Sequence, residues 1–231
     1  MNKENYLNKI DNLKLEIEKY NKEIFENENI RKENKEQSFK IIKGNIPIIF
    51  SAPHCVSQTR ENKLKMAEGE TGAIVQILAK DMNCYGVYKT YNDNDDANYD
   101  IEGNKYKEAL LKLVKDDNIK LLIDLHGAKN EHEFDIEICT DNGNNIDNKN
   151  YIIDMLKKSF ENNGIDNITE NSIFKASSIR TISKYIHSKT NIPCIQLEMT
   201  GRYRYIENIE GIAKLINGLE YFVNNINKGE L

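Results

Sequence analysis

The chain has 231 residues, of which 30% are charged and 39% are hydrophobic, and its formal net charge is -5. This length suits one α/β domain, or a smaller domain with an appended segment. The basic residues are scattered among acidic ones, which excludes the basic stripe of a nucleic-acid-binding protein, and no apolar run reaches the roughly 18 residues that span a bilayer.

The expected location is the cytoplasm, because the first residues are polar and include no apolar stretch of a secretory signal. The four cysteines are far apart along the chain, without a Cys-x-x-Cys pair. In a chain without an export signal, they are expected to be reduced thiols. We therefore expect neither a membrane nor a nucleic acid as a partner.

Residues 1–37 are predicted to form an N-terminal helical arm in front of an α/β domain at 38–231. From residue 3 to about 26, apolar side chains recur alternately four and three residues apart on an otherwise charged helix. These positions are Tyr6, Ile10, Leu13, Ile17, Tyr20 and Ile24. Such a seam fits either a helix that lies on its own subunit or a coiled-coil contact in a homo-oligomer.

The domain is expected to begin with two strands, at 38–42 and 46–50. The three residues between them, 43–45, include a glycine and predict a hairpin. The second strand runs into Pro53, which cannot donate to a sheet ladder, so the strand should stop there. His54 is thus expected at the carboxyl end of a buried strand.

A long polar loop follows, and Thr71 is expected to cap a helix that ends near residue 82. A strand is predicted at 85–90. The next segment, 92–100, is a loop of acids and amides. It lacks the central glycine and the closing glutamate of a calcium-binding EF-hand.

A helix is predicted at 106–115, and the next strand, from Lys120, runs into His126. Gly127 is expected to let the chain turn away after that strand. The strict alternation at 134–140 predicts a half-buried strand.

Helices are predicted at 151–162, 181–187 and 207–224, and a strand at 192–198 that ends on Glu198. Strands that alternate with helices predict a mixed, mainly parallel sheet covered by helices on both faces.

Two histidines and a glutamate therefore stand at strand ends, the edge where α/β sheets collect ligands. A hydrolytic zinc ion needs three ligands of the His/Glu/Asp kind and one open position, and its enzyme needs a carboxylate that moves the proton of the attacking water. His54, His126 and Glu198 can fill these roles. Glu68 and Glu70 are both candidates for the third ligand, and spacing does not decide between them.

Five segments stand in a specific order along the chain. They are Ser51-Ala52-Pro53-His54, then Arg60 with Lys65-Met66-Ala67-Glu68-Gly69-Glu70-Thr71-Gly72, then Asp95-Asp96-Ala97-Asn98, Asp124-Leu125-His126-Gly127 and Gln196-Leu197-Glu198. In this order they resemble the N-formylglutamate amidohydrolase family over about residues 38–205. The resemblance implies a zinc-dependent amide hydrolase with the phosphorylase/hydrolase-like α/β fold, akin to zinc carboxypeptidases and aspartoacylases.

The resemblance also implies roles for single residues. One Zn²⁺ per chain would be held by His54, Glu68 and His126, with water in the fourth position and Glu198 as the catalytic carboxylate. Glu68 is preferred to Glu70 because it precedes the Thr-Gly pair by three residues.

Substrate binding departs from the family at one position. Asn98 matches the Asn of the family's Asp-x-Asn-Arg segment, but Tyr99 follows it where the family has Arg. A substrate carboxylate needs a fork of donors, which arginine supplies best. Arg60, Arg180 and Arg202 are therefore candidate substrate-binding residues together with Asn98.

The predicted activity is hydrolysis of an N-formyl or N-acyl amide of a small acidic, amino-acid-like substrate. The alternatives are a carboxypeptidase-like peptide hydrolase and a non-catalytic binding or assembly protein that uses the arm. His132 and His187 are expected to be structural, and Arg204 to form a surface salt bridge.

Overall fold

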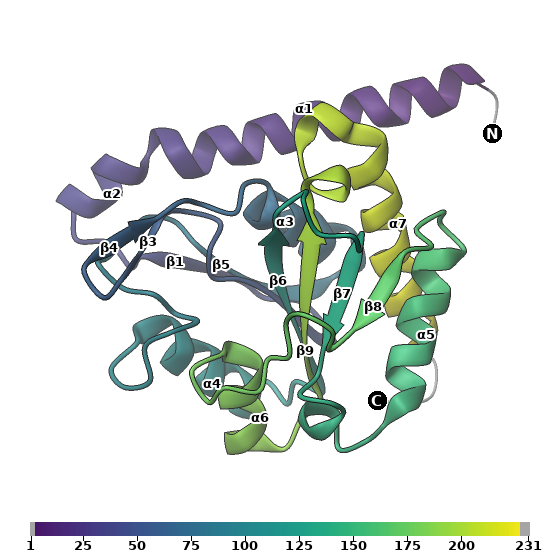
Figure 1. Cartoon of the computed structure of the whole chain (residues 1–231). Helices are drawn as coiled ribbons and strands as arrows, with labels where there is room; N and C mark the ends of the chain where they lie inside the picture. Colours follow the sequence, from purple (N-terminus) through teal and green to yellow (C-terminus); the bar gives the residue numbers. More distant parts are fainter. Residues whose placement is uncertain (1–2, 227–231) are drawn as a thin grey trace.

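The structure is a computed structural model, and it describes residues 3–226 (Figure 1). The strands are β1 (Phe39–Ile42), β2 (Ile46–Ala52), β3 (Gln58–Arg60), β4 (Lys63–Lys65), β5 (Cys84–Lys89), β6 (Leu121–Ala128), β7 (Ile136–Cys139), β8 (Ile168–Glu170) and β9 (Cys194–Thr200). The helices are α1 (Lys3–Glu26), α2 (Glu28–Glu33), α3 (Thr71–Met82), α4 (Lys105–Asp116), α5 (Asn150–Glu161), α6 (Ile182–Thr190) and α7 (Ile209–Ile226). Within residues 3–226, no helix combines the length and the apolar character that crossing a bilayer requires.

The main sheet has seven strands in the order β1-β5-β2-β6-β9-β7-β8. Its central strands β5, β2, β6 and β9 are parallel to one another, whereas β1 and β7 run antiparallel to their neighbours β5 and β9. β3 and β4 form a separate two-stranded sheet. This confirms the predicted mixed, mainly parallel sheet.

The predicted hairpin at 38–50 is wrong. β1 and β2 do not pair, because β5 lies between them and bonds to both. The connection of residues 43–45 is long enough for this, since four Cα steps reach roughly 13 Å and two strand spacings need about 10 Å. Asn83, just before β5, accepts hydrogen bonds from the backbone N–H groups of Asn45 and Ile46 on its carbonyl oxygen at 2.8 and 3.0 Å. β5 therefore occupies the position beside β2 that β1 was expected to take.

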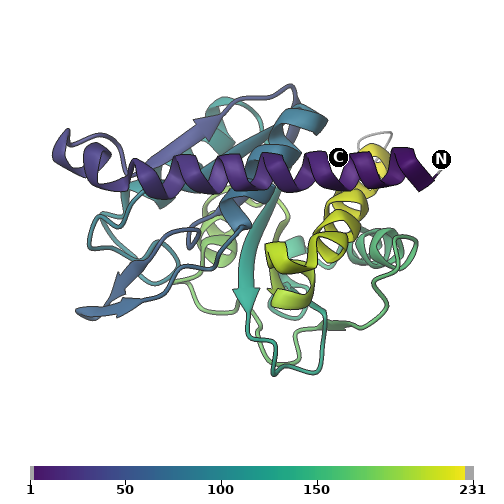
Figure 2. The same cartoon turned by 90° about the horizontal axis from the view of Figure 1, so that it is seen from above.

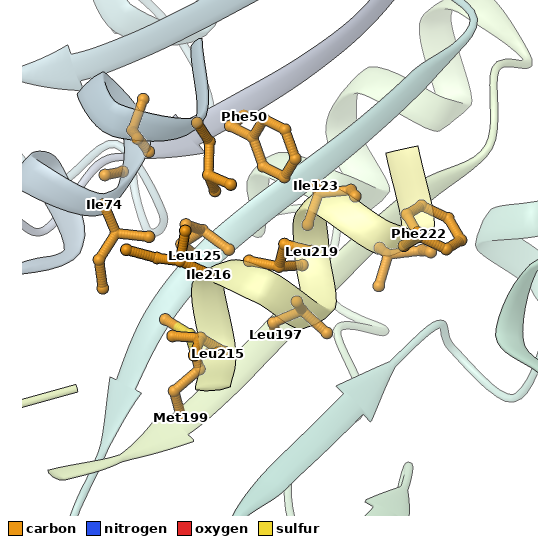
Figure 3. Close-up of a cluster of buried hydrophobic side chains, with 14 of the residues drawn as sticks. Phe50, Ile74, Ile123, Leu125, Leu197, Met199, Leu215, Ile216, Leu219 and Phe222 are labelled. Atoms are coloured by element: carbon orange, nitrogen blue, oxygen red, sulfur yellow. The ribbon is translucent and has the colours of Figure 1, made fainter. Parts of the chain in front are cut away.

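Side chains of the central strands alternate between two cores. One face carries Phe50, Ile123 and Leu197, and Figure 3 shows them against Ile74 of α3 and several side chains of α7. The opposite face carries the smaller cluster that includes residues of α4 and α6. In Figure 1 these two groups of helices lie on opposite sides of the sheet, as predicted.

Helix α1 packs on the body of its own chain. Ile10, Ile17 and Ile24 of the apolar seam are buried, and α1 contacts α3 and α7. Seen from above, it runs across the molecule over these two helices (Figure 2). The seam thus packs on its own subunit, which is the first of the two predicted arrangements.

Two local predictions need correction. Thr71 is the first residue of α3 and not its cap, because Glu70 precedes it in a left-handed conformation with φ of 63°. Strand β7 is buried throughout and not half-buried. The buried Glu137 in this strand is satisfied by backbone N–H groups of residues 172–174, so its position in the alternation does not mark a solvent face.

Candidate metal centre

The site begins where one face of the sheet changes from apolar to polar. On the α4 and α6 side, Leu122 and Cys194 belong to the core. Toward the carboxyl ends of the same strands, the side chains on that face are those of Asp124 and His126 in β6 and of Gln196 and Glu198 in β9. Asp124 is paired with Gln196 in register, and His126 with Glu198. The parallel register therefore brings the second histidine beside the predicted catalytic carboxylate.

His54 reaches the same edge from the turn after β2. Its carbonyl oxygen accepts a hydrogen bond from the backbone N–H of Glu68 at 2.8 Å, which closes the polar loop back onto the strand end. The hydroxyl of Thr71 donates to the carbonyl oxygen of Glu68 at 2.8 Å, which ties this loop to the start of α3. The loop thus holds Glu68 over the sheet edge.

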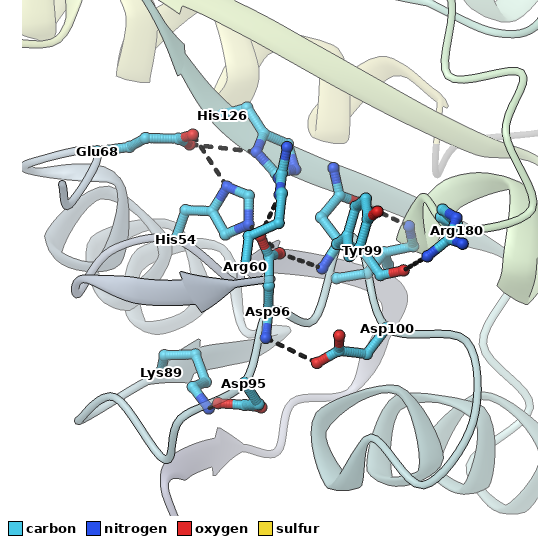
Figure 4. Close-up of polar contacts among 12 residues, drawn as sticks. His54, Arg60, Glu68, Lys89, Asp95, Asp96, Tyr99, Asp100, His126 and Arg180 are labelled. Atoms are coloured by element: carbon cyan, nitrogen blue, oxygen red, sulfur yellow. Dashed lines mark hydrogen bonds and ion pairs between the residues drawn. The ribbon is translucent and has the colours of Figure 1, made fainter. Parts of the chain in front are cut away.

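The Glu68 carboxylate bridges the two imidazoles (Figure 4). Its Oε1 lies 2.9 Å from Nδ1 of His54, and its Oε2 lies 3.1 Å from Nδ1 of His126. Oε2 also accepts a hydrogen bond from the backbone N–H of Gly127 at 2.9 Å. The two rings have centroids 4.8 Å apart and planes inclined at 78°.

A second carboxylate holds each histidine from behind. Nε2 of His54 lies 2.9 Å from Oδ1 of Asp96, and Nε2 of His126 lies 2.8 Å from Oδ2 of Asp124. A carboxylate can only accept, so each Nε2 donates to its aspartate. Each Nδ1 faces the Glu68 carboxylate in the same way, and it is the nitrogen that would give up its proton to bind a cation beside Glu68. Carboxylates in this position orient metal-binding histidines and raise their basicity.

The carboxylates around the histidines favour positive charge at this place. Burial lowers the pKa of His54, but the carboxylates of Glu68 and Asp96 outweigh this effect and raise it to about 9. Burial opposes the same shift in His126, and Asp124 and Glu68 raise its pKa well above the usual value. Although burial acts in the other direction, the two imidazoles lower the pKa of Glu68.

The donor set fits a zinc ion. His54, Glu68 and His126 offer two nitrogens and one oxygen within 4.8 Å of one another. Ligands 2.0–2.2 Å from a tetrahedral ion stand roughly 3.3–3.5 Å apart. The contacts of the two Nδ1 atoms with the two oxygens of Glu68, at 2.9 and 3.1 Å, are a little shorter than this. Glu70 points away from the histidines and toward Arg204. Burial raises the pKa of Glu70, and the charge of Arg204 acts in the opposite direction. Of the two glutamates left open by the sequence, the structure brings Glu68 to the histidines.

Glu198 lies in the cavity next to this cluster. The cavity has a volume of about 510 Å³ and is also lined by His54, Glu68 and His126. Oε1 of Glu198 accepts a hydrogen bond from Nε2 of Gln196 at 2.8 Å. Burial raises the pKa of Glu198 to about 7, against the opposing effect of His126.

Comparison with solved structures finds the same fold in several proteins. A gene product of Agrobacterium tumefaciens matches with a TM-score of 0.56 and 10% identity over 83% of this chain and 95% of its own. A bacteriophage poly-gamma-glutamate hydrolase matches with a TM-score of 0.51 and 14% identity over 82% and 90% of the two chains. A metallo-carboxypeptidase from Burkholderia cenocepacia matches with a TM-score of 0.52 and 11% identity over 78% of this chain and 57% of its own.

The chain shares their α/β fold, which is of the phosphorylase/hydrolase-like type. This confirms the expected fold class. Comparisons with protein-family models and with curated protein sequences find no match. The similarity to known proteins is therefore structural. At sequence identities of 10–14% it shows the fold alone.

Only two of the four predicted substrate-binding residues line the cavity. Arg60 and Asn98 line the cavity. Arg60 donates from Nε to Oδ2 of Asp96 at 2.7 Å, and Oδ1 of Asn98 accepts from the backbone N–H of Ile182 at 2.8 Å. The backbone N–H of Asn98 donates to Oδ1 of Asp96 at 3.0 Å, so both residues are bonded to the carboxylate that contacts His54.

Arg180 and Tyr99 form a pair next in sequence to the cavity residues Thr181 and Asn98, and neither of the two lines the cavity itself. The Arg180 guanidinium lies 4.3 Å from the centroid of the Tyr99 ring and donates to the Tyr99 carbonyl oxygen at 3.1 Å. The guanidinium of Arg60 lies 5.0 Å from the same centroid. In Figure 4 the Tyr99 ring lies between the two arginines.

Arg202 is not brought to the cavity. Its Nε donates to Oδ1 of Asp135 at 2.8 Å, and its Nη2 donates to the carbonyl oxygens of His132 and Phe134. These bonds tie the segment after β9 to the loop before β7. The Arg202 guanidinium therefore has a structural role.

The expected turn at Gly127 is wrong, and so is the expected surface position of Arg204. Gly127 lies inside β6, and a Cβ atom there would stand 2.6 Å from Cζ of Arg204. Arg204 is 3% exposed and donates to the carbonyl oxygens of Gly69 and Met199. The missing side chain at Gly127 thus makes room for an arginine that binds the loop beside Glu68.

Asp96 and Asp124, the outer carboxylates behind the two histidines, were not predicted as site residues, although both stand in the segments that carry the family resemblance. Asp124 precedes His126 by two positions, so the period of a strand already placed both on one face. Asp96 gave no such signal, because its loop has no periodicity. Two further cavity residues were also missed: Gln196, and His132, which stacks on Phe134 with centroids 5.1 Å apart.

Proposed function

We propose that the chain is a zinc-dependent amidohydrolase that cleaves an N-formyl or N-acyl amide of a small acidic, amino-acid-like substrate. One observation carries the proposal: His54, Glu68 and His126 converge on the cavity that also holds Glu198. The fold similarity to a metallo-carboxypeptidase and to a poly-gamma-glutamate hydrolase supports it. The order of the segments that resemble N-formylglutamate amidohydrolases supports it as well.

Glu198 is the proton carrier of the proposed reaction. When bound to these three side chains, zinc supplies a Lewis acid that polarises a carbonyl group and lowers the pKa of water. The Glu198 carboxylate takes the proton of the attacking water and delivers it to the leaving nitrogen. A pKa near 7 suits both transfers at neutral pH. Asp96 and Asp124 keep the two imidazoles in the orientation that directs each Nδ1 toward Glu68.

The substrate carboxylate is proposed to bind Arg60, Asn98 and Arg180. Within residues 3–226, neither Nη atom of Arg60 nor Nη2 of Arg180 has a hydrogen-bond partner. Oδ1 of Asn98 is occupied by Ile182, which leaves Nδ2 as a donor at the cavity wall. Guanidinium groups recognise carboxylates through paired N–H bonds. Arg180 beside Tyr99 thus offers the charge that the family places at residue 99.

A substrate panel tests the proposal. The zinc-loaded protein is assayed with N-formyl-L-glutamate, N-acetyl-L-glutamate, a γ-linked glutamate oligomer and a peptide with a free carboxyl terminus. We expect hydrolysis of an N-acyl acidic compound and a fall in kcat of about 100-fold or more in Glu198→Gln. The exposed Glu131→Gln is the matched control. Unchanged turnover in Glu198→Gln would remove this residue from the mechanism.

A carboxypeptidase-like peptide hydrolase is the second candidate. The similarity of the fold to that of a metallo-carboxypeptidase favours it. Faster cleavage of the peptide with a free carboxyl terminus than of the N-acyl compounds would favour this candidate over the first.

A non-catalytic binding or assembly protein on the same fold is the third. Helix α1 exposes Leu7, Leu15 and Phe25, apolar side chains that a partner or a second copy could cover. A protein that forms stable oligomers through α1 in analytical ultracentrifugation, and that turns over no member of the panel, would support this reading.

A further inference from the structure

Tyr99 lies between two arginines that the proposed function assigns to the substrate (Figure 4). The guanidinium carbon of Arg180 is 4.3 Å from the centroid of the Tyr99 ring, and that of Arg60 is 5.0 Å from it. Both distances are within the range of a cation–π contact. The two guanidinium carbons are therefore no more than about 9 Å apart, which is the sum of these distances.

Tyr99 is itself held in place by three hydrogen bonds. Its hydroxyl donates to the carboxylate of Glu61 in the turn between β3 and β4. Its backbone N–H donates to the carbonyl oxygen of Asp96 at 2.9 Å, and its carbonyl oxygen accepts from Nη1 of Arg180 at 3.1 Å. The ring therefore cannot leave the space between the two guanidinium groups without breaking these contacts.

The charges of the two arginines are not balanced in the same way. Nε of Arg60 forms an ion pair with Asp96 at 2.7 Å. In the part of the chain that the structure describes, Arg180 has no ion pair, and its Nη1 is bonded to an uncharged carbonyl oxygen. Like charges that are held close together repel each other. An acidic group of a ligand would balance the charge of Arg180.

The two arginines also differ in their position relative to the cavity. Arg60 and Asn98 line the cavity that holds the metal-binding side chains, and Arg180 lies outside it, next in sequence to Thr181. In an N-acyl amino acid, only the α-carbon separates the α-carboxylate from the amide nitrogen, so this carboxylate stays close to the metal centre. A carboxylate on the side chain extends further and can reach a group beyond the cavity wall.

We propose that Tyr99 is a positioning residue whose ring keeps Arg60 and Arg180 apart as two separate carboxylate-binding groups. Arg60, together with Asn98, binds the α-carboxylate, and Arg180 binds a second carboxylate on the side chain of the substrate. The inference rests on the proposed amide hydrolysis and narrows its substrates to N-acyl derivatives of acidic amino acids. Without the ring, both guanidinium groups can turn toward one carboxylate, and the selectivity for two acidic groups weakens.

Binding of two probes of the same shape tests the inference. N-formyl-L-glutamate and N-formyl-L-glutamine differ in the second carboxylate, which only the first compound has. Their affinities are measured by calorimetry with the zinc-loaded Glu198→Gln protein, in which turnover is slow. We expect the glutamate compound to bind at least about 10-fold more tightly, because hydrogen bonds between two charged groups are stronger than those to a neutral amide.

Three variants in this background separate the roles of the residues. Tyr99→Leu removes the ring, so the glutamate-to-glutamine affinity ratio should fall by about 3-fold, the size of a cation–π effect at an exposed site. Tyr99→Phe keeps both faces of the ring and should keep the ratio. Arg180→Met should bring the ratio close to one while the affinity for N-formyl-L-glutamine stays the same. Tyr221→Leu, at an exposed tyrosine of α7, is the matched control.

The outcomes distinguish this inference from the function on which it rests. An unchanged ratio in Tyr99→Leu, or an equal loss of affinity for both probes in Arg180→Met, would overturn the inference, and the proposed function would stand if N-formyl-L-glutamate is hydrolysed. If neither probe binds and no panel compound is turned over, both fall together. Zinc content and Tm are measured on every variant, and Tyr99→Met replaces Tyr99→Leu if either value changes.

Discussion

Glu137 and Glu198 lie directly opposite each other across the β7 and β9 pair, yet they serve different neighbours. Glu137 is buried and accepts hydrogen bonds from three successive backbone N–H groups, those of Ser172, Ile173 and Phe174. Glu198 faces the cavity with Gln196. Because Ile173 and Phe174 line the same cavity, the first carboxylate holds the wall against which the second would act.

Replacement of Glu137 should loosen this wall. Glu137→Gln removes the charge and turns an N–H donor toward backbone donors, so we expect a loss of about 2 kcal/mol of stability. Hydrogen exchange at the amides of residues 172–174 should accelerate, and KM for the best panel substrate should rise. Glu131→Gln, in the exposed loop before β7, is the control. Unchanged exchange at these three amides would show that Glu137 does not hold the wall.

A side chain at Gly127 should disturb the Glu68 loop through Arg204. In Gly127→Ala, the new Cβ would overlap the guanidinium that binds the Gly69 carbonyl oxygen. Overpacking of this kind costs about 1–3 kcal/mol, measured by urea denaturation, and zinc affinity should fall with it. Gly69→Ala is the matched control, since its Cβ would stand 3.9 Å from Nη1 of Arg204, an ordinary contact. Equal stability of the two variants would contradict this account.

The outer carboxylate of His126 should set zinc affinity. Asp124→Asn keeps an oxygen for the Nε2 proton but removes the charge that raises the basicity of the ring. We expect a loss of about 10- to 100-fold in zinc affinity, measured by competition with a chelator. Asp154→Asn, on the exposed side of α5, should leave the affinity unchanged. A similar affinity in wild type and Asp124→Asn would rule out this supporting role.

Lys107 should make stability depend on alkaline pH. Burial lowers its pKa to about 8, against the opposing charges of Asp100 and Asp96. Between that value and the ordinary pKa of about 10.5, the unfolded chain binds more protons than the folded one, so stability rises with pH in this window. The slope is at most about 1.4 kcal/mol per pH unit.

Lys107→Met isolates that contribution. The variant loses two hydrogen bonds to the carbonyl oxygens of Asp100 and Arg180, so it should be less stable at pH 7. The difference in stability between wild type and Lys107→Met should widen from pH 8 to 10 in urea titrations. The exposed Lys105→Met should show no such trend. A constant difference across this range would mean that Lys107 titrates normally.

The sequence was enough to locate the ends of the central strands, because buried β-rich runs and Pro53 mark them by local rules. His54, His126 and Glu198 could be predicted as site residues because they stand at these strand ends. The place of β5 between β1 and β2 could not be predicted, since strand order depends on long-range pairing that no local pattern carries. Glu137 was hidden for a related reason: a charged residue in an alternating strand predicts a solvent face, and the three N–H groups that satisfy it lie 35 to 37 residues further along the chain.

The central claim, that His54, Glu68 and His126 hold one zinc ion, is tested most directly by metal analysis of the purified protein after zinc loading and gel filtration. We expect about one zinc per chain in wild type and almost none in folded His126→Ala, with His187→Ala unchanged. A wild-type chain that retains no zinc, or a His126→Ala chain that retains all of it, would contradict the claim.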